Sequence, residues 1–248
     1  MIKLGLIGYG KAGCAVASVL SADPRFDLRW VARRTACVEG QKLEGSNTAL
    51  IGLEALDFSR WLDANPVDAL VDFSVPESLA QYGPELQSRG MMLVSAISAY
   101  TEEQLAYARS LGAHTRILCS PNITLGINFL IMAAKLLRNI APFADVEILE
   151  QHFKEKPEVS GTAKKIAESL ELGSEKITSL RLGGIVGHHE VIFGFPYQTV
   201  RLTHDSIRRE AFGTGAAFAL GELALCDKGF YNFEDLLMKK LREQLAIR

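Results

Sequence analysis

A histidine, a lysine and a run of small hydroxyl-bearing residues lie close together near the middle of the chain: His152, Lys156 and Ser160-Gly161-Thr162. Histidine transfers protons near neutral pH, and lysine donates a proton or adds charge beside an anion. The Ser-Gly-Thr run opens an amphipathic helix, so hydroxyls and unpaired backbone N–H groups can cradle a carboxylate. Taken singly, His152 could be a structural histidine and the Ser-Gly-Thr run could be a helix cap. Together they predict proton transfer to a small dicarboxylate bound beside a hydride donor.

A glycine-rich loop at the N-terminus is the motif for that donor. Gly8-x-Gly10-x-x-Gly13 follows a short apolar run and precedes helix-type spacing. The first glycine permits a tight turn, the second brings the backbone close to a pyrophosphate, and the third lets the helix pack on the strand. The helix N-terminus then offers free N–H groups to the phosphates. The motif predicts a dinucleotide site, the alternative being a glycine turn without a ligand.

Two arginines stand where the second strand ends. Sites that bind NAD usually carry an acidic residue there, which contacts the ribose hydroxyl. This chain has Arg33-Arg34, and guanidinium groups form charge-assisted bonds with a 2′-phosphate. The pair favours NADPH as the cofactor. NADH is the alternative if the arginines are only a solvated basic pair.

The first half of the chain alternates between apolar strands and amphipathic helices, which is typical of a parallel sheet covered on both faces. Strands are expected at Ile2–Ile7, Phe26–Ala32, Asp68–Phe73, Met91–Ala96 and Arg116–Cys119, and helices at Lys11–Leu20, Leu53–Leu62, Pro76–Arg89 and Glu102–Leu111. Thr101 before Glu102 resembles a helix start, and Pro76 suits a first turn.

The pattern changes after Ser120-Pro121-Asn122. The expected elements are helix Ile127–Ile140, strand Ala144–Phe153, helix Gly161–Leu172, paired strands Val186–Phe193 and Gln198–His204, and helix Ala211–Leu225. Neighbouring strands without a helix between them indicate an antiparallel, open-faced sheet. The predicted fold class is α/β: a Rossmann-type dinucleotide-binding domain of residues 1–122 and 210–248, with an inserted α+β domain of residues 123–209 that carries an open mixed sheet.

Composition and charge exclude several classes of protein. The 248 residues carry a formal net charge of −2 with a pI of about 6.2, so no strong positive field recruits nucleic acid or an anionic membrane. No apolar run reaches the ~18 residues of a membrane span, and the N-terminus has no signal-peptide pattern. The cysteines lack metal-ligand or disulfide spacing, and we expect them to be small core residues: Cys14, Cys37, Cys119 and Cys226. These features indicate a cytoplasmic protein without a metal site.

Several blocks of sequence are distinctive when taken in order. Besides the glycine loop they are VDFSVPE at 71–77, SPNITLGIN at 120–128, VEILEQHFKEK at 146–156, SGTA at 160–163, IVGHHEVIF at 185–193, LTHDSIRREAFGTGA at 202–216 and the closing GFYNFEDLL. Nearly end to end, they resemble the dihydrodipicolinate reductase (4-hydroxy-tetrahydrodipicolinate reductase) family of the diaminopimelate route to lysine. The resemblance implies NAD(P)H-dependent reduction of 4-hydroxy-tetrahydrodipicolinate to tetrahydrodipicolinate. It also implies a homotetramer, built by the open sheet of a substrate-binding and oligomerisation domain.

The resemblance assigns roles residue by residue. His152 matches the family's catalytic acid/base, Lys156 its proton donor, and Ser160-Gly161-Thr162 the turn that binds a substrate carboxylate. The implied cofactor contacts are Gly8, Gly10, Lys11, Ala12, Gly13, Arg33, Arg34, Phe73, Ser95 and Ser98. The further substrate contacts are Asn122 and Arg209. His189 falls in a matching block and is expected to be structural or close to the substrate.

Four features depart from the family's pattern. Phe153 replaces the second of two adjacent histidines, and Ser95-Ala96-Ile97-Ser98 replaces a Gly-Thr-Thr-Gly loop. The approach to Ser160 is one residue shorter, and the connection between Leu172 and Leu182 is short. Two alternatives therefore stay open: a same-fold reductase acting on a different imine or keto dicarboxylate, and a non-catalytic NADP-binding sensor. A sensor needs no proton donor and carboxylate cradle together, so the sequence favours an enzyme.

Overall fold

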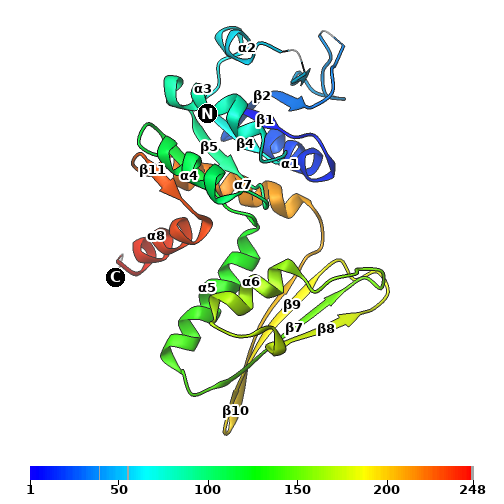
Figure 1. Cartoon of the computed structure of the whole chain (residues 1–248), viewed down its shortest axis with the longest axis vertical. Helices are drawn as coiled ribbons and strands as arrows, with labels where there is room; N and C mark the ends of the chain where they lie inside the picture. Colours follow the sequence, from blue (N-terminus) through cyan, green and yellow to red (C-terminus); the bar gives the residue numbers. More distant parts are fainter. Residues whose placement is uncertain (39, 55, 247–248) are drawn as a thin grey trace. The chain divides into compact units, whose positions relative to one another are not determined.

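The chain divides into two compact units. The computed structural model describes residues 1–38, 40–54 and 56–246. Unit 1 comprises Met1–Thr124 and Phe212–Arg248, and unit 2 comprises Leu125–Ala211 (Figure 1). The sequence analysis expects the breaks at 122/123 and 209/210.

A parallel sheet forms the centre of unit 1. Within the described residues its strand order is β11-β6-β5-β4-β1-β2-β3, and every pairing is parallel. The strands are β1 (Ile2–Ile7), β2 (Phe26–Arg33), β3 (Ala49–Gly52), β4 (Ala69–Asp72), β5 (Met92–Ser95), β6 (Arg116–Cys119) and β11 (Gly229–Tyr231). The chain order reverses direction between β1 and β4, and dinucleotides bind beyond the carboxyl ends of strands at such a switch point. The predicted Rossmann-type α/β fold is confirmed.

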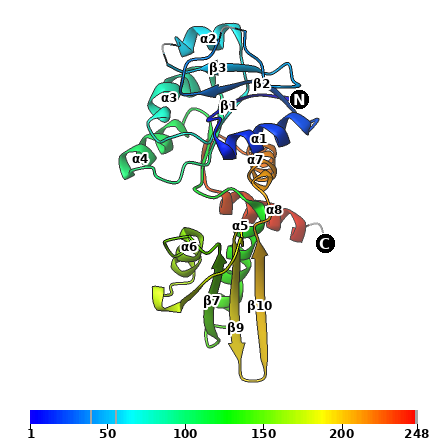
Figure 2. The same ribbon diagram turned by 90° about the vertical axis from the view of Figure 1, so that its right-hand side faces the viewer.

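Helices cover both faces of this sheet. They are α1 (Lys11–Ala22), α2 (Phe58–Ala64), α3 (Ser78–Arg89), α4 (Glu102–Leu111), α7 (Glu210–Leu223) and α8 (Phe233–Ala246). Figure 2 shows α1 and α7 on one side of the sheet, with α3 and α4 on the other. α1 and α7 pack closely at Gly213: a Cβ there would lie 2.5 Å from the Val19 side chain, so glycine permits the contact. Thr101 and Gln104 form a capping box that starts α4, as predicted.

Unit 2 combines a four-stranded mixed sheet with two helices. In the described residues the strand order is β10-β9-β7-β8, with β8 parallel to β7 and the other pairs antiparallel. The elements are α5 (Leu125–Ile140), β7 (Asp145–His152), α6 (Gly161–Ser169), the 3₁₀ turn Ser174–Lys176, β8 (Ile177–Arg181), β9 (His188–Phe195) and β10 (Gln198–Asp205). Ile127 and Leu130 of α5, Ile166 of α6, Ile148 of β7 and Phe193 of β9 share one core. The predicted α+β unit with a mixed sheet is confirmed.

Two predicted helices differ from the structure by three residues or more at one end. The helix expected at Leu53–Leu62 begins at Phe58, because the Asp57 carboxylate accepts a hydrogen bond from the Arg60 N–H at 3.0 Å and caps the helix there. The helix expected at Gly161–Leu172 ends at Ser169, and Glu171 follows with a positive φ of 56°. A residue in that conformation stops a helix.

Three strands and one helix were not predicted. β3, β8, β11 and α8 lie outside the expected elements, and β9 spans His188–Phe195 rather than Val186–Phe193. β3 and β11 are short edge strands, which present too few residues for a clear alternation.

Among the described residues, no helix combines the length and apolar character that crossing a bilayer requires.

The prediction that all cysteines are core residues is wrong. Cys119 is buried, Cys37 and Cys226 are half-buried, and Cys14 is exposed on α1. Cys14 lies in the first turn of that helix, directly after the last glycine of the loop.

Candidate active site

The glycine loop between β1 and α1 shapes one wall of a pocket in unit 1. Gly8 has a φ of +95°, and a Cβ there would lie 2.7 Å from the Phe73 carbonyl oxygen. A Cβ on Gly13 would lie 1.8 Å from the Gly8 carbonyl oxygen, so both positions require glycine. Gly10 is the N-cap of α1, and no described heavy atom lies within 4 Å of where its Cβ would be. The free N–H groups of α1 therefore face open space that suits a phosphate.

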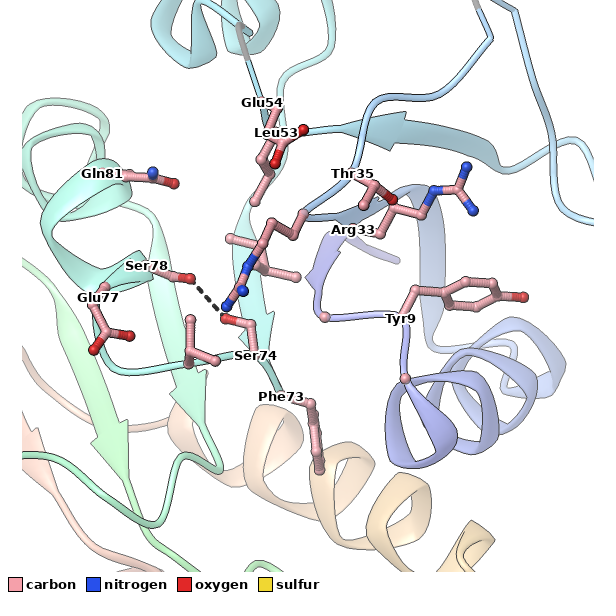
Figure 3. A pocket seen from close by; sticks show the side chains of 15 residues that line it. Tyr9, Arg33, Thr35, Leu53, Glu54, Phe73, Ser74, Glu77, Ser78 and Gln81 are labelled. Carbon is pink, nitrogen blue, oxygen red and sulfur yellow. Dashed lines mark hydrogen bonds between the residues drawn. The ribbon is translucent and has the colours of Figure 1, made fainter.

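The pocket has a volume of about 690 Å³, within the usual range of small-molecule sites. Figure 3 shows it between the glycine loop, the segment after β2 and the start of α3. Its lining includes Gly8, Gly10, Arg33, Arg34, Thr35, Glu54, Phe73, Ser74, Ser78 and Gln81. The Nε of Arg33 donates to Cys37 Sγ at 3.0 Å, which holds this guanidinium on its own loop. With Arg34, it places two positive charges on the pocket wall, and these favour a phosphate-bearing ligand.

A smaller pocket of about 420 Å³ shares Phe73, Ser74 and Val75 with the first. Its other lining residues are mostly apolar: Ala12, Pro76, Ala96, Ile97, Ser98, Ala99, Pro121, Ile123 and Phe212. The predicted cofactor contacts Ala12, Phe73 and Ser98 thus lie on this wall, whereas Lys11 is exposed at the first position of α1. Together the two pockets offer a positively charged region that suits phosphates and an apolar region that suits a ring.

Ser95, another predicted cofactor contact, has no exposed surface and lines neither pocket. Its hydroxyl pairs with Tyr100 Oη at 2.9 Å and accepts a hydrogen bond from the Ile97 N–H at 3.4 Å. Ser95 ends a central strand that is buried on both faces, and its hydroxyl supports the Ile97 loop that lines the smaller pocket. Its contact with the cofactor stays a prediction.

A buried carboxylate supports the segment that the two pockets share. Asp72 ends β4 with no exposed surface and accepts hydrogen bonds from Ser74 N at 2.8 Å, Ser74 Oγ and Tyr82 Oη. Burial raises the pKa of Asp72 to about 6, although these hydrogen bonds oppose the rise. Asp72 therefore fixes the turn that presents Phe73 and Ser74 to the pockets.

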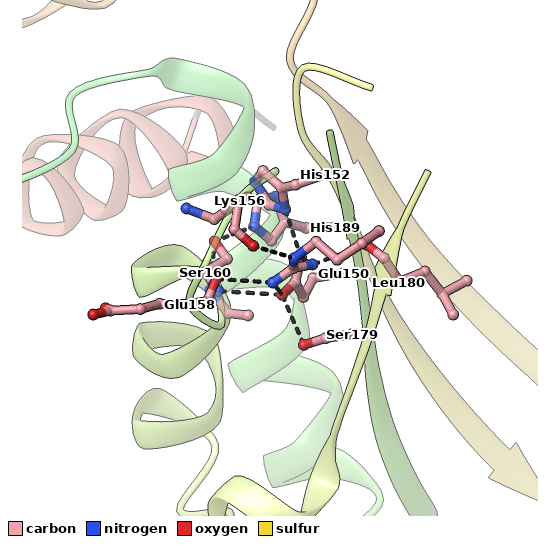
Figure 4. A network of polar contacts seen from close by, with 10 residues as sticks. Glu150, His152, Lys156, Glu158, Ser160, Ser179, Leu180 and His189 are labelled. Atoms are coloured by element: carbon pink, nitrogen blue, oxygen red, sulfur yellow. Dashed lines mark hydrogen bonds and ion pairs between the residues drawn. The ribbon is translucent and has the colours of Figure 1, made fainter. Parts of the chain in front are cut away.

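In unit 2, His152 lies at the end of β7 with 8% of its surface exposed. Its Nδ1 hydrogen-bonds to a carboxylate oxygen of Glu150 (Figure 4). A carboxylate accepts only, so the proton belongs on Nδ1 and Nε2 is the nitrogen that can face a ligand. A Cβ on Gly187 would lie 3.1 Å from Nε2, so glycine at this position keeps the nitrogen open.

Glu150 has no exposed surface and is the centre of a hydrogen-bond network. Its carboxylate accepts from Arg181 Nη1 at 3.0 Å and Nη2 at 2.8 Å, from Ser179 Oγ at 2.7 Å and from Ser160 N at 3.2 Å, besides His152. Burial alone would raise the pKa of Glu150, but these hydrogen bonds outweigh burial and lower the pKa to about 2. Glu150 is therefore ionised at neutral pH.

Ser160 joins this network to the start of α6. Its Oγ accepts from the Ala163 N–H at 3.4 Å as the N-cap and pairs with His189 Nε2 at 2.8 Å. Burial, followed by the charges of His152 and His204, lowers the pKa of His189 to about 4, so this imidazole is neutral at pH 7. The rings of His189 and His152 meet edge to face with centroids 5.3 Å apart.

The remaining residues of the predicted substrate turn lie beside this network. Gly161 is exposed and Thr162 half-buried, and their N–H groups have no hydrogen-bond partner in the part of the chain that the structure describes. Lys156 is half-buried in the loop before α6, on the same side of the network as His152 and His189 in Figure 4. Unit 2 therefore brings together an imidazole, an ammonium group and a free helix N-terminus, which suit proton transfer to a bound carboxylate.

The two remaining predicted substrate contacts are Asn122 and Arg209. Asn122 belongs to unit 1, where its Oδ1 accepts from Thr124 N at 2.9 Å and closes a turn before α5. Arg209 is exposed after β10 and is not part of the Glu150 network. Within the described residues, no group of three or more His, Cys, Asp or Glu side chains could hold a metal ion.

Sequence reasoning did not assign roles to Glu150, Ser179 or Arg181. The alternation along β7 contained part of the signal, because Glu150 and His152 share the face of the buried Val146 and Ile148. A charged residue on a buried strand face needs a partner. That partner comes from β8, which the sequence analysis treated as a short connection.

Comparisons with known proteins agree with this arrangement. The family model described as dihydrodipicolinate reductase, N-terminus, matches residues 2–123, and the model for its C-terminus matches residues 122–237. A 4-hydroxy-tetrahydrodipicolinate reductase of Caldanaerobacter subterraneus subsp. tengcongensis is 31% identical, over 96% of this chain and 99% of the relative. The enzyme of that name from Thermosipho africanus is 30% identical, over 95% of this chain and 98% of the relative.

Solved structures share the fold. A dipicolinate-bound dihydrodipicolinate reductase from Paenisporosarcina sp. TG-14 superposes with a TM-score of 0.77 at 22% identity, over 94% of this chain and 97% of that chain. A diaminopimelate dehydrogenase of C. glutamicum superposes with a TM-score of 0.57 at 12% identity, over 94% of this chain and 93% of that one. The two family models cover both units almost completely. The chain therefore belongs to the dihydrodipicolinate reductase family.

Proposed function

We propose that this protein reduces 4-hydroxy-tetrahydrodipicolinate to tetrahydrodipicolinate with NADPH, in diaminopimelate and lysine biosynthesis. The observation that carries the proposal is the set of His152, Lys156 and the free N-terminus of α6 in unit 2, in a chain whose unit 1 has a dinucleotide pocket. The curated relatives bear the name of this reaction along nearly their whole length. When bound, the cofactor supplies the hydride.

The protein's own residues bind the substrate and move a proton. One carboxylate of the substrate is bound by the N–H groups of Gly161 and Thr162, and the Lys156 ammonium adds a positive charge. His152 holds a proton on Nδ1 against Glu150 and presents Nε2 to the substrate. The Lys156 ammonium, or Nε2 of a His152 ring that carries a proton on both nitrogens, supplies the proton that accompanies reduction.

The preference for NADPH is attributed to Arg33 and Arg34, whose charges line the larger pocket. Glu54 also lines it, and its carboxylate can accept hydrogen bonds from the ribose hydroxyls of NADH. Arg33→Ala with Arg34→Ala is expected to weaken NADPH binding and spare NADH, as measured by fluorescence titration of both cofactors. An unchanged preference would refute the role of the arginines.

The assembly that we propose is a cytoplasmic homotetramer built through the open face of the unit 2 sheet. On β10, Thr199, Arg201 and Thr203 alternate with half-buried residues and are exposed. Sedimentation or light scattering is expected to give a mass near four times the 27.2 kDa chain. A monomer would contradict this assembly.

The direct test follows NADPH oxidation by absorbance after mixing the protein with substrate formed in situ from pyruvate and aspartate semialdehyde. Turnover on the order of 1–10³ s⁻¹ is the expected result. The apolar wall made by Ala96 and Ile97 favours one second candidate, a reductase of the same fold acting on a different imine or keto dicarboxylate. Binding of NADPH without its oxidation would exclude the first substrate and direct screening to that class.

A further inference from the structure

Arg181, the last residue of β8, uses every hydrogen-bond donor of its guanidinium group. Nε donates to the Lys156 carbonyl at 3.1 Å, and Nη1 donates to Glu150 Oε2 at 3.0 Å and to the Leu180 carbonyl at 2.8 Å. Nη2 donates to Glu150 Oε1 at 2.8 Å and to the Glu158 carbonyl at 2.8 Å. A guanidinium has five N–H donors in a rigid plane, so the side chain has a single orientation.

These bonds join the two parts of the substrate site. On one side, the fork of Arg181 orients the Glu150 carboxylate, which in turn accepts from His152 Nδ1. On the other side, the Lys156 and Glu158 carbonyls fix the loop before α6, and Glu150 holds that loop's last N–H, on Ser160. One side chain thus sets the orientation of the imidazole and the path of the lysine loop.

We propose that Arg181 is the positioning residue of the active site, fixing both His152 and the Lys156 loop through Glu150 and the two loop carbonyls. The inference rests on the proposed function, since it concerns the residues that move the proton. Register supports it: Arg181 pairs with His152, and Ser179 with Glu150, across β7 and β8. Among the described residues, the hydrogen bonds of the Arg181 side chain go to Glu150 and to backbone carbonyls, and none goes to Gly161 or Thr162.

Lysine cannot replace this arginine. Its ammonium group is a point charge with three donors, so it can satisfy Glu150 but cannot also reach both carbonyls in the fixed geometry. In Arg181→Ala, which has no cation at this position, the buried Glu150 carboxylate loses its main counter-charge and becomes easier to protonate. A protonated Glu150 would donate to His152 Nδ1 and move the imidazole proton to Nε2.

The test compares Arg181→Lys with wild type, using Arg138→Lys as the matched control in the same unit. Arg138 Nη1 donates to the Pro142 carbonyl at 3.0 Å and to the Ala144 carbonyl at 3.1 Å, and Arg138 is not part of the Glu150 network. We expect Arg181→Lys to lower kcat by about 10- to 100-fold, the cost of a small misplacement of reacting groups, with NADPH affinity unchanged. Arg138→Lys should retain wild-type kcat. In Arg181→Ala, methylguanidinium should restore kcat at least about tenfold, whereas ethylammonium should not.

Nitrogen-15 NMR of His152 tests the same proposal without turnover. Wild type is expected to show a single tautomer with Nδ1 protonated, and Arg181→Ala a mixture of tautomers. The proposal is overturned if Arg181→Ala retains the wild-type tautomer, or if the kcat of Arg181→Lys stays within about twofold of wild type. If wild type does not reduce 4-hydroxy-tetrahydrodipicolinate, the proposed function fails, whereas the NMR comparison still decides the role of Arg181.

Discussion

Replacing Ser160 by alanine removes one hydroxyl that serves two partners at the start of α6. Ser160 Oγ caps the helix by accepting from the Ala163 N–H, and it pairs with His189 Nε2 at 2.8 Å. His189 is 4% exposed, and its other nitrogen, Nδ1, already has no hydrogen-bond partner among the described residues. In Ser160→Ala both imidazole nitrogens are therefore buried without a partner.

The magnitude follows from these two losses. Loss of a serine N-cap costs about 1 kcal/mol, and leaving a buried polar atom unpaired costs about 1–3 kcal/mol. Ser160→Ala should therefore destabilise the region around α6 by about 2–4 kcal/mol. In a His189→Phe background only the cap is lost, so the same substitution should cost about 1 kcal/mol. The coupling between the two positions is then about 1–3 kcal/mol.

Peptide-resolved hydrogen exchange of the α6 amides measures this coupling, because it reports local opening of unit 2 and not only global unfolding. Ser169→Ala is the control: this hydroxyl bonds the Ile166 carbonyl at the other end of the same helix, at 2.8 Å, and its loss should change protection by less than about 0.5 kcal/mol. Equal costs of Ser160→Ala with and without His189 would refute the argument, since the hydroxyl would then act only as a cap.

Three further predictions concern the cofactor loop and the buried titratable groups. Gly13→Ala should weaken NADPH binding about 100-fold in a fluorescence titration. A Cβ 1.8 Å from the Gly8 carbonyl oxygen displaces the loop and breaks about two charge-assisted bonds of about 1.5 kcal/mol each. Affinity within tenfold of wild type would contradict this. The pKa of His189 is lowered from 6.5 to about 4 on folding, so the unfolded chain binds the extra proton. The free energy of unfolding should therefore fall as pH drops from 6.5 towards 4, by up to about 1.4 kcal/mol per pH unit. Urea denaturation of wild type and His189→Phe checks whether the variant loses this dependence of stability on pH. The pKa of Asp72 is raised from 3.8 to about 6. Its contribution to the free energy of unfolding is therefore full below pH 3.8 and is lost as pH rises through about 6. Asp72→Asn should lack this loss when urea midpoints are compared across that range.

Local patterns predicted most of unit 1. The apolar run of β1, the glycine spacing and the capping box at Thr101 each depend on neighbouring residues, and the structure has each of them. The surroundings of Ser95 were harder to predict. Its place at the end of a central strand was clear, but its hydroxyl pairs with Tyr100 Oη, and that contact depends on how the following loop folds.

The support of the unit 2 site depends on pairing between distant segments, which local pattern does not reveal. Glu150 alternates with buried residues, so the sequence indicates a charge facing the core. Nothing local indicates that β8 runs parallel to β7 and brings Ser179 and Arg181 beside it. A five-residue strand with Ser and Arg on its inner face has too little apolar character to be distinguished from a loop.

Two of the departures from the family, Phe153 and the Ala96-Ile97 segment, lie outside this network. Phe153 is 41% exposed, since the residue after His152 turns away from the core, and it makes no contact with the Glu150 carboxylate. Ala96 and Ile97 line the apolar pocket of unit 1. The residues that hold the imidazole, the lysine loop and the helix N-terminus are connected through Arg181. Any difference in substrate from the family should trace to Ala96 and Ile97, and restoring threonines there should alter substrate preference without changing the His152 tautomer.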